Sequence, residues 1–241
     1  MTVQLLSLEE VGERAESGST EPYICRLSDD QSYVVKGRTA LPRGLIAEAV
    51  SATLGRAFGL PVPAFALVEM NPRLFEFDPD ARRSLGEGIG FGSQYVESLI
   101  ELGRIKLEDT DQAVLARLFL FDYWISNADR TGTEYGGNSN LFMNVETRDI
   151  VVVDHNLAFD QKFDSDGGFE HHICRDFWFN RAADFWSQAA VLADMEKAIA
   201  LVDPLFEHLP KEWTDSAPTI RDEIDRALAR YQTDAFWAAL A

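Results

Sequence analysis

The sequence predicts an α+β fold with two lobes, a small strand-rich lobe over residues 1–97 and a mainly helical lobe over residues 98–241. Two observations lead to this prediction. Short runs of β-forming residues, interrupted by one helical stretch, occupy the first half of the chain, whereas helical spacing dominates the second half. The helical half also carries one further pair of strands. A chain of 241 residues is long enough to bury a substantial core.

The first lobe begins with a predicted hairpin and a helix. The segments 22–27 and 32–36 are rich in β-forming residues and enclose a polar turn. Lys36 lies near the end of the second of these strands. Residues 43–58 repeat apolar residues at helical spacing, and Glu48 lies near the inward edge of that helix.

The rest of the first lobe contains one clear strand and one long loop. Gly59 and Pro61 end the predicted helix, and residues 64–70 read as a strand. Residues 71–92 contain prolines and four glycines, so we predict a loop there. Residues 93–97 are predicted to form a strand that crosses between the lobes.

The second lobe is predicted to be built around a buried helix. Residues 111–126 are apolar nearly all round, as is typical of a helix in the middle of a domain. A polar loop follows, and two apolar segments, 141–143 and 150–153, are predicted to pair as strands. Apolar residues at helical spacing near the C-terminus indicate further helices: Ile220, Ile224, Leu228 and Tyr231.

Composition and charge restrict the class of protein. Apolar residues make up 46% of the chain and charged residues 26%, which is typical of globular proteins. No apolar run reaches the ~18 residues that a membrane span needs, and the N-terminus does not resemble a secretion signal, so we expect a cytoplasmic protein. The two cysteines, Cys25 and Cys174, are expected to be half-buried thiols.

The formal net charge of −18 argues against direct contact with nucleic acid or with anionic membranes. It does not exclude a nucleotide, because a nucleotide site needs only a few local donors and a metal ion. It would attract a basic protein.

Three polar residues are predicted to converge at one end of the second hairpin. Asn140 directly precedes the first strand, Asp154 follows the second, and Asp129 lies on the loop that leads to that end. Mg²⁺ prefers oxygen ligands, and phosphoryl transfer also needs a carboxylate that accepts the proton of the attacking hydroxyl. A lysine on a strand and a glutamate on a helix, such as Lys36 and Glu48, complete the order found in two-lobed kinases.

The residues around this hairpin resemble a known family. The segments 124–130, 138–143 and 151–159, together with Tyr33–Gly37, Leu45–Glu48 and Gly59–Pro63, are similar to the HipA-like kinases. These are bacterial relatives of protein kinases and phosphatidylinositol kinases. The resemblance covers roughly residues 20–160 and implies a bilobal, protein-kinase-like fold with ATP and Mg²⁺ as cofactors.

The resemblance also implies a role for each matching residue. Asp129 would be the catalytic base, and Arg130 would steady its loop; Asn140 and Asp154 would bind magnesium. Lys36 would contact the ATP phosphates with Glu48 as its partner, and Tyr95, Val96 and Glu97 would form the hinge that receives adenine.

The partners follow from the same resemblance. Family members phosphorylate serine or threonine on proteins, in some cases aminoacyl-tRNA synthetases, so a translation-related protein is an expected substrate. Several members act as toxins, so an antitoxin or other regulator is an expected partner.

Some residues leave alternatives open. Asn138 competes with Asn140 for the metal, although the strand begins directly after Asn140. The segment from Leu27 to Ser32, expected to cover the phosphates, contains no glycine; Ser28 and Ser32 are candidate autophosphorylation sites within it.

The pair His171 and His172, with Cys174, lies too close in sequence for a four-ligand zinc site. Two other functions remain. The first is a small-molecule or lipid kinase of the same fold, and the second is a catalytically inactive kinase fold that serves as a binding module.

Overall fold

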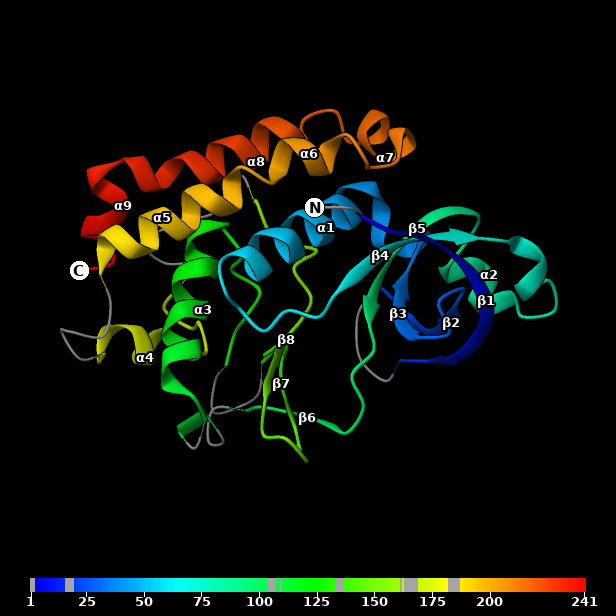
Figure 1. Ribbon diagram of the computed structural model, residues 1–241, viewed down its shortest axis with the longest axis horizontal. Coiled ribbons are helices and arrows are strands. Elements are labelled where there is room, and N and C mark those ends of the chain that lie inside the picture. Colours follow the sequence, from blue (N-terminus) through cyan, green and yellow to red (C-terminus); the bar gives the residue numbers. More distant parts are fainter. Residues whose placement is uncertain are drawn as a thin grey trace.

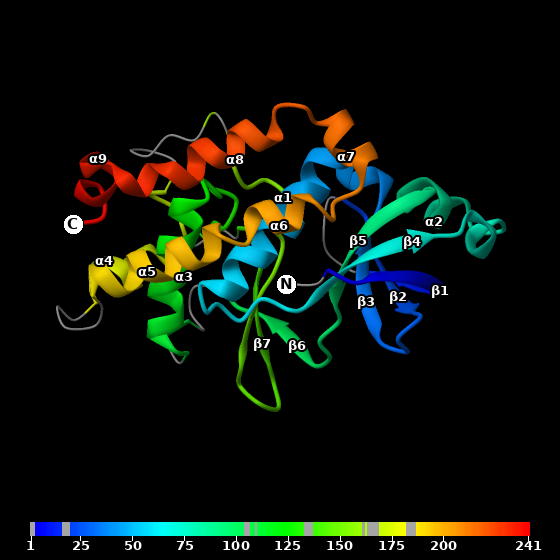
Figure 2. The same ribbon diagram turned by 45° about the horizontal axis from the view of Figure 1, so that its top comes forward.

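The structure is a computed structural model that describes residues 3–15, 20–103, 107–108, 110–132, 137–160, 162, 169–181 and 187–241. A strand-rich part and a helical part lie side by side, and one long helix, α1, runs between them (Figure 1). A second small sheet lies beside the helical part (Figures 1 and 2). No helix among the described residues is long and apolar enough to cross a membrane.

The strand-rich part is a closed five-stranded barrel in the order β1-β2-β3-β5-β4. The β1 and β4 strands pair in parallel, and the other neighbours pair antiparallel. Its strands are β1 (Leu5–Arg14), β2 (Tyr23–Leu27), β3 (Ser32–Lys36), β4 (Phe65–Met70) and β5 (Gly88–Gln94). Buried side chains fill the barrel, among them Leu27, Val35 and Val68. The predicted first hairpin and the strand at 64–70 are confirmed.

Two strands of the barrel differ from the sequence prediction. The prediction contained no strand before residue 22, because only Leu8 of the ten residues of β1 is buried and the rest of the strand is mostly exposed. The loop predicted over 71–92 is wrong at its glycine-rich end, which forms β5. A Cβ on Gly90 would lie 2.6 Å from the carbonyl oxygen of Lys36, and one on Gly92 would lie 2.8 Å from Val68. The glycines therefore allow neighbouring strands to approach closely.

The predicted helix at 43–58 is α1 (Leu41–Ala57), and 12 of its 17 residues are buried. It packs against α5 (Gln188–Ile199), α6 (Val202–Phe206) and α7 (Lys211–Ser216). Its apolar side chains belong to the large core of the helical part and not to the barrel interior. The helix ends before Gly59, which has a positive φ of 84°.

The second sheet holds the predicted hairpin. Strand β7 (Leu141–Asn144) pairs antiparallel with β8 (Ile150–Val152), and on its other side with the short β6 (Leu99–Glu101). The predicted buried helix is α3 (Gln112–Trp124), and its residues from Leu118 to Trp124 are all buried. The side chain of Asp111 caps its N-terminus by accepting from the amides of Ala113 and Val114.

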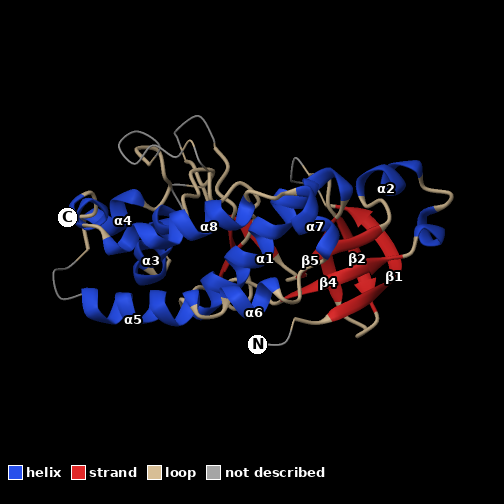
Figure 3. Cartoon of the chain, turned by 90° about the horizontal axis from the view of Figure 1, so that it is seen from above, coloured by secondary structure: helices blue, strands red, loops and turns tan. Residues whose placement is uncertain are grey.

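The last third of the chain is helical, as predicted, and its helices flank α3 and α1 (Figure 3). Besides α5 to α7 it contains α4 (Arg175–Phe179), α8 (Ile220–Ala229) and α9 (Asp234–Ala238). Short helices complete the described chain: η1 (Arg38–Ala40), η2 (Pro72–Phe75), α2 (Pro79–Ser84) and η4 (Arg230–Gln232). Cys25 and Cys174 are fully buried free thiols, more deeply buried than expected.

Candidate functional site

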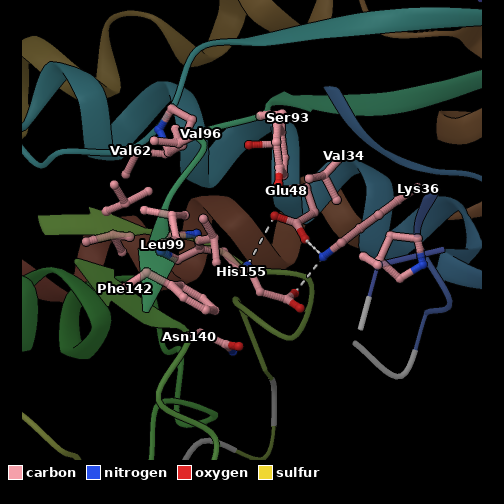
Figure 4. A pocket seen from close by; sticks show the side chains of 18 of the residues that line it. Val34, Lys36, Glu48, Val62, Ser93, Val96, Leu99, Asn140, Phe142 and His155 are labelled. Atoms are coloured by element: carbon pink, nitrogen blue, oxygen red, sulfur yellow. Dashed lines mark hydrogen bonds and ion pairs between the residues drawn. The ribbon is translucent and has the colours of Figure 1, made fainter. Parts of the chain in front are cut away.

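A cavity of about 860 Å³ opens where the barrel meets the β6–β8 sheet (Figure 4). It gathers side chains from β2, β3, α1, β5, β6, β7 and the segments around β8. Of the residues singled out in the sequence, Lys36, Glu48, Tyr95, Val96, Asp129, Asn138, Asn140 and Asp154 line it. Glu97 and Arg130 are not among the lining residues.

The centre of the cavity is an ion-paired triad in which Lys36 and Glu48 are buried and Asp154 is partly buried. The ammonium of Lys36, at the end of β3, contacts the Glu48 carboxylate from α1 and lies 2.8 Å from Oδ1 of Asp154. Lys36 is 6% exposed and Glu48 is 3% exposed. The second oxygen of Glu48 accepts the backbone N–H of His155 at 3.1 Å. Residues from three distant parts of the sequence are thereby joined (Figure 4).

The charges of this triad are set by burial and by each other. Burial raises the pKa of Glu48 to about 7, against the opposing effect of Lys36. Burial also disfavours a charged Asp154, but the neighbouring Lys36 ammonium prevails, and the pKa of Asp154 lies below its usual value. Burial lowers the pKa of Lys36, but the two carboxylates more than offset it, so Lys36 is charged.

The hairpin end brings Asn140 and Asp154 together, as predicted. The N–H of Val153 donates to the carbonyl oxygen of Asn140 at 3.1 Å. Asn140 and Asp154 both have left-handed backbone conformations, with φ of 45° and 58°. Such conformations cost about 1–3 kcal/mol each and persist only where the surroundings enforce them, which is common at functional sites.

Asp129 lies on the loop after α3 and faces the same end of the hairpin. Its Oδ2 accepts from Nδ2 of Asn138 at 2.7 Å and from Nδ2 of Asn140 at 3.5 Å. Burial and the negative charge of Asp154 raise the pKa of the Asp129 carboxyl. Asn138, the competitor for the metal, is thus engaged with the carboxylate of Asp129.

Arg130 is fully buried behind the hairpin end. Its Nε donates to Asp122 at 2.6 Å, and Nη1 donates to the carbonyls of Ser139 at 2.9 Å and Asn140 at 2.5 Å. Its Nη2 contacts Nε2 of His155 at 3.1 Å and the Val153 carbonyl at 3.4 Å. All five N–H groups of the guanidinium therefore have acceptors. Arg130 holds the backbone at both candidate metal ligands, which agrees with the steadying role expected of it.

Comparison with known proteins identifies the family. A family model described as HipA-like kinase matches residues 8–240. The chain belongs to the HipA-like kinase family. None of the curated proteins compared with it matches its sequence.

Two solved kinase structures are similar to this HipA-like kinase over most of its length. The crystal structure of the Helicobacter pylori proinflammatory kinase CtkA has a TM-score of 0.58 at 11% identity, over 99% of this chain and 97% of that one. A Golgi casein kinase with Mn and ADP bound gives a TM-score of 0.47 at 12% identity, over 98% of this chain and 73% of that chain. The predicted bilobal, kinase-like α+β fold is confirmed by the first of these structures.

Of the residues expected to form the hinge of this HipA-like kinase, Tyr95 and Val96 line the apolar end of the cavity. The backbone N–H of Tyr95 donates to the carbonyl of Ser32 at 2.9 Å, which continues the pairing of β3 with β5. Glu97 lies outside the lining, and its carbonyl accepts from Nδ2 of Asn144 at 3.0 Å. Among the described residues, no hydrogen bond to the Val96 amide is present. The apolar walls come from Val34, Val62, Val96, Leu99 and Phe142 (Figure 4).

The prediction that residues 27–32 cover the phosphates is wrong. Residues 27–32 form the turn between β2 and β3 and do not line the cavity. Ser28, one of the candidate autophosphorylation sites, is exposed, and its Oγ accepts the N–H of Ser7 at 3.1 Å. The cavity is instead bordered by the end of β1, through Glu13 and Arg14, and by Ala15 and Pro22. The error arises because β1, which is mostly exposed, was missing from the prediction.

One buried charge was not singled out from the sequence. Asp122 lies in the otherwise apolar part of α3 and is completely buried. Burial alone would raise its pKa, but the Arg130 guanidinium and His172 hold the pKa of Asp122 well below its usual range. The available signal was a lone carboxylate within an apolar helix, because a buried charge needs a partner.

Proposed function

We propose that this HipA-like kinase transfers the γ-phosphoryl group of Mg-ATP to a hydroxyl group, with serine or threonine on a protein as acceptor. The observation that carries the proposal is the Lys36 ammonium held between Glu48 and Asp154, in a cavity that also contains Asp129 and Asn140. A lysine on a strand, its helix glutamate and a metal-binding aspartate are the positioning parts of kinases.

The nucleotide would lie along the length of the cavity. Adenine would occupy the apolar end and bind hinge backbone groups at Val96, between Val34 and Phe142. Tyr95 would line the wall of the adenine pocket, whereas Glu97 would contribute only its backbone to the hinge. The phosphates would then reach Lys36, whose charge Glu48 and Asp154 maintain.

The residues at the hairpin end fit a magnesium ion. Asn140 and Asp154 supply an amide oxygen and a carboxylate, which are hard oxygen donors, and Mg²⁺ takes its remaining ligands from phosphates and water. When bound, the ion would neutralise charge on the phosphates. The pKa of Asp154 lies below its usual value, so its carboxylate is ionised and ready to act as a ligand.

Asp129 is suited to the proton transfer. The acceptor oxygen would form a bond to the γ-phosphorus as the bond from that phosphorus to the bridging β–γ oxygen breaks, and ADP leaves with the bridging oxygen. The hydroxyl proton would pass to the Asp129 carboxylate and then to solvent. The amide of Asn138 fixes the orientation of that carboxylate by donating to Oδ2 at 2.7 Å, which leaves Oδ1 for the hydroxyl.

The acceptor is proposed to be a basic protein. The net charge of −18 attracts positively charged partners. A translation-related substrate and an antitoxin or other regulator stay predictions from the family resemblance. We also propose that the small lobe ends at residue 97, because β5 belongs to the barrel while β6 pairs with β7.

The test is ATP turnover and autophosphorylation with Mg²⁺, comparing the unchanged chain with Asp129→Asn and Asp154→Asn. We expect both substitutions to abolish transfer, Asp129→Asn with nucleotide binding retained and Asp154→Asn with weakened metal binding. Both variants should keep the circular dichroism spectrum of the unchanged chain. If the unchanged chain binds Mg-ATP and transfers nothing to itself or to protein, lipid or small-molecule acceptors, the binding-module function takes its place.

A further inference from the structure

His172 connects the segment that follows the hairpin to the buried carboxylate of Asp122. Its Nε2 lies 3.0 Å from Oδ2 of Asp122, and its Nδ1 accepts the N–H of Cys174 at 3.1 Å. Because Nδ1 is an acceptor, Nε2 carries the proton and donates to Asp122. Burial lowers the pKa of His172, so the ring is neutral and has this one tautomer.

The ring of His172 is also fixed by aromatic packing. It stacks on Phe169 with a centroid distance of 5.2 Å and an interplanar angle of 9°. It meets Phe119 of α3 edge-on at 5.1 Å. The side chain is therefore held in one orientation by two rings and two hydrogen bonds. The neighbouring His171 is exposed.

The segment around His172 is bound to the loop that carries Asp129. The N–H of Gly132 donates to the carbonyl of His171 at 3.0 Å, and the N–H of Ile173 donates to the carbonyl of Arg130 at 3.1 Å. Thr131 and His172 form an isolated antiparallel β-bridge. Backbone pairing and the His172–Asp122 hydrogen bond thus both join residues 171–173 to the region around Arg130.

Asp122 connects His172 to the hairpin end through Arg130. It receives three donors, from His172, from Nδ2 of Asn127 at 2.8 Å and from Nε of Arg130 at 2.6 Å. The opposite end of the Arg130 guanidinium holds the carbonyls of Asn140 and Val153. A continuous chain of hydrogen bonds therefore runs from the downstream segment to the strained backbone at the candidate metal ligands.

We propose that Asp122 and His172 are positioning residues for the metal site, and that docking of residues 169–174 on the loop is required to hold Asn140 and Asp154 in place. This inference rests on the proposed function. Side chains that orient metal ligands in this way affect metal affinity or activity by about ten- to a hundred-fold when they are replaced.

His172→Phe is the discriminating variant. It keeps an aromatic ring against Phe169 and Phe119 but removes both hydrogen bonds. His171→Phe is the matched control, because it makes the same change at the exposed neighbour. His172→Gln is the conservative variant, since its amide N–H can still donate to Asp122.

Two measurements test the proposal. The first is hydrogen exchange of the metal-free protein, and we expect His172→Phe to speed exchange in peptides covering 137–141 and 152–155 as well as 169–174. The second is Mn²⁺ binding in the presence of a non-hydrolysable ATP analogue. There we expect about a ten-fold or greater loss of affinity for His172→Phe, with His172→Gln close to the unchanged chain and His171→Phe without effect.

Three results would overturn the proposal. If faster exchange is confined to 169–174 and Mn²⁺ affinity is unchanged, His172 only stabilises its own segment. If His172→Phe fails to fold, Asp122→Asn is used instead, and unchanged Mn²⁺ affinity in that variant also rejects it. If the unchanged chain does not bind Mn²⁺ with the nucleotide, and Asp154→Asn makes no difference, the proposed function fails and this inference fails with it.

Discussion

Replacing Lys36 with methionine tests whether its single charge holds the buried Glu48 carboxylate and the partly buried Asp154 carboxylate in place. Lys36 is 6% exposed, and its ammonium contacts both Glu48 and Asp154. Methionine has a similar length and no charge, so the substitution removes the ion pairs with little change in packing volume. Glu48 and Asp154 are then left without their cation.

The size of the effect follows from the geometry. With an effective dielectric constant of about 20, unit charges 2.8 Å apart, as in the Lys36–Asp154 pair, attract by about 6 kcal/mol before desolvation is counted. Removing one partner of a buried pair costs about 3–5 kcal/mol in measured cases, because the other charge stays buried. For a chain of this length, that corresponds to a fall in melting temperature of about 6–20 °C.

The assay is thermal unfolding at several pH values, followed by circular dichroism. The pKa of Glu48 is about 7 with Lys36 present, above its unfolded value of 4.5, and it rises further once the lysine is removed. A carboxyl whose pKa is raised in the folded state gains stability as pH falls from the folded towards the unfolded pKa. The deficit of Lys36→Met should therefore be smaller at pH 5 than at pH 8.

Arg26→Met is the matched control. Arg26 contacts three carboxylates, those of Glu9, Glu10 and Asp30, but its side chain is 43% exposed. Exposed ion pairs add little because water and salt screen them, so this variant should melt close to the unchanged chain. The reasoning fails if Lys36→Met melts like the unchanged chain, or if Arg26→Met loses as much stability as Lys36→Met.

Two further predictions concern packing. Gly37→Ala should lower the free energy of unfolding by about 1–3 kcal/mol, because its new Cβ would lie 2.2 Å from the carbonyl oxygen of Leu85. Gly103→Ala is the control, since its Cβ would meet nothing within 4 Å. Chemical denaturation of the two variants would show the difference. An equal effect at both glycines would contradict the close approach. Cys25 and Cys174 should resist a thiol reagent in the folded protein and react after unfolding, because burial raises the pKa of both thiols, that of Cys25 to about 12. Rapid labelling of the folded protein would contradict their burial.

The candidate site was predictable where strand ends carried the chemistry. Asn140 directly precedes β7 and Asp154 lies two residues after β8, and antiparallel pairing of these two strands brings the positions together. Lys36 and Glu48 were predictable because a strand end and the inner face of a helix can be recognised from their spacing. In each case, the local pattern and the final packing favoured the same structure.

Two strands of the barrel, β1 and β5, were harder to predict because they lack the usual patterns. The β1 strand is part of the barrel, but only one of its ten residues is buried, and its charged side chains are exposed. The β5 strand is rich in glycine, which ordinarily indicates a turn. Its glycines are required by contacts with Lys36 and Val68, which lie far away in the sequence. Close approach between distant strands leaves no periodic pattern along the chain.

The network around Asp122 could be predicted only in part. A carboxylate within an apolar helix indicates a buried charge, but its partner Arg130 lies beyond the helix end, and its other partner His172 lies 50 residues after Asp122. Of the adjacent pair His171 and His172, only His172 is buried, and its ring donates to Asp122. Which of two adjacent histidines is buried depends on backbone pairing with Gly132 and Arg130.

Helix α1 is held in its position by the helical part of the same chain. In kinases, the lysine–glutamate pair forms only when the helix that carries the glutamate is in place. Here α5, α6 and α7 cover α1. Arg43 at its start donates to the carbonyl of Phe159 at 3.0 Å and pairs with Glu223 of α8 at 3.0 Å.

The barrel is tied to the same helices. The indole of Trp213 in α7 donates to the carbonyl of Ile89 in β5 at 3.1 Å. Moving α1 away from Lys36 would therefore separate buried apolar surfaces and break the contact between Arg43 and Glu223. The Lys36–Glu48 pair therefore forms together with the fold.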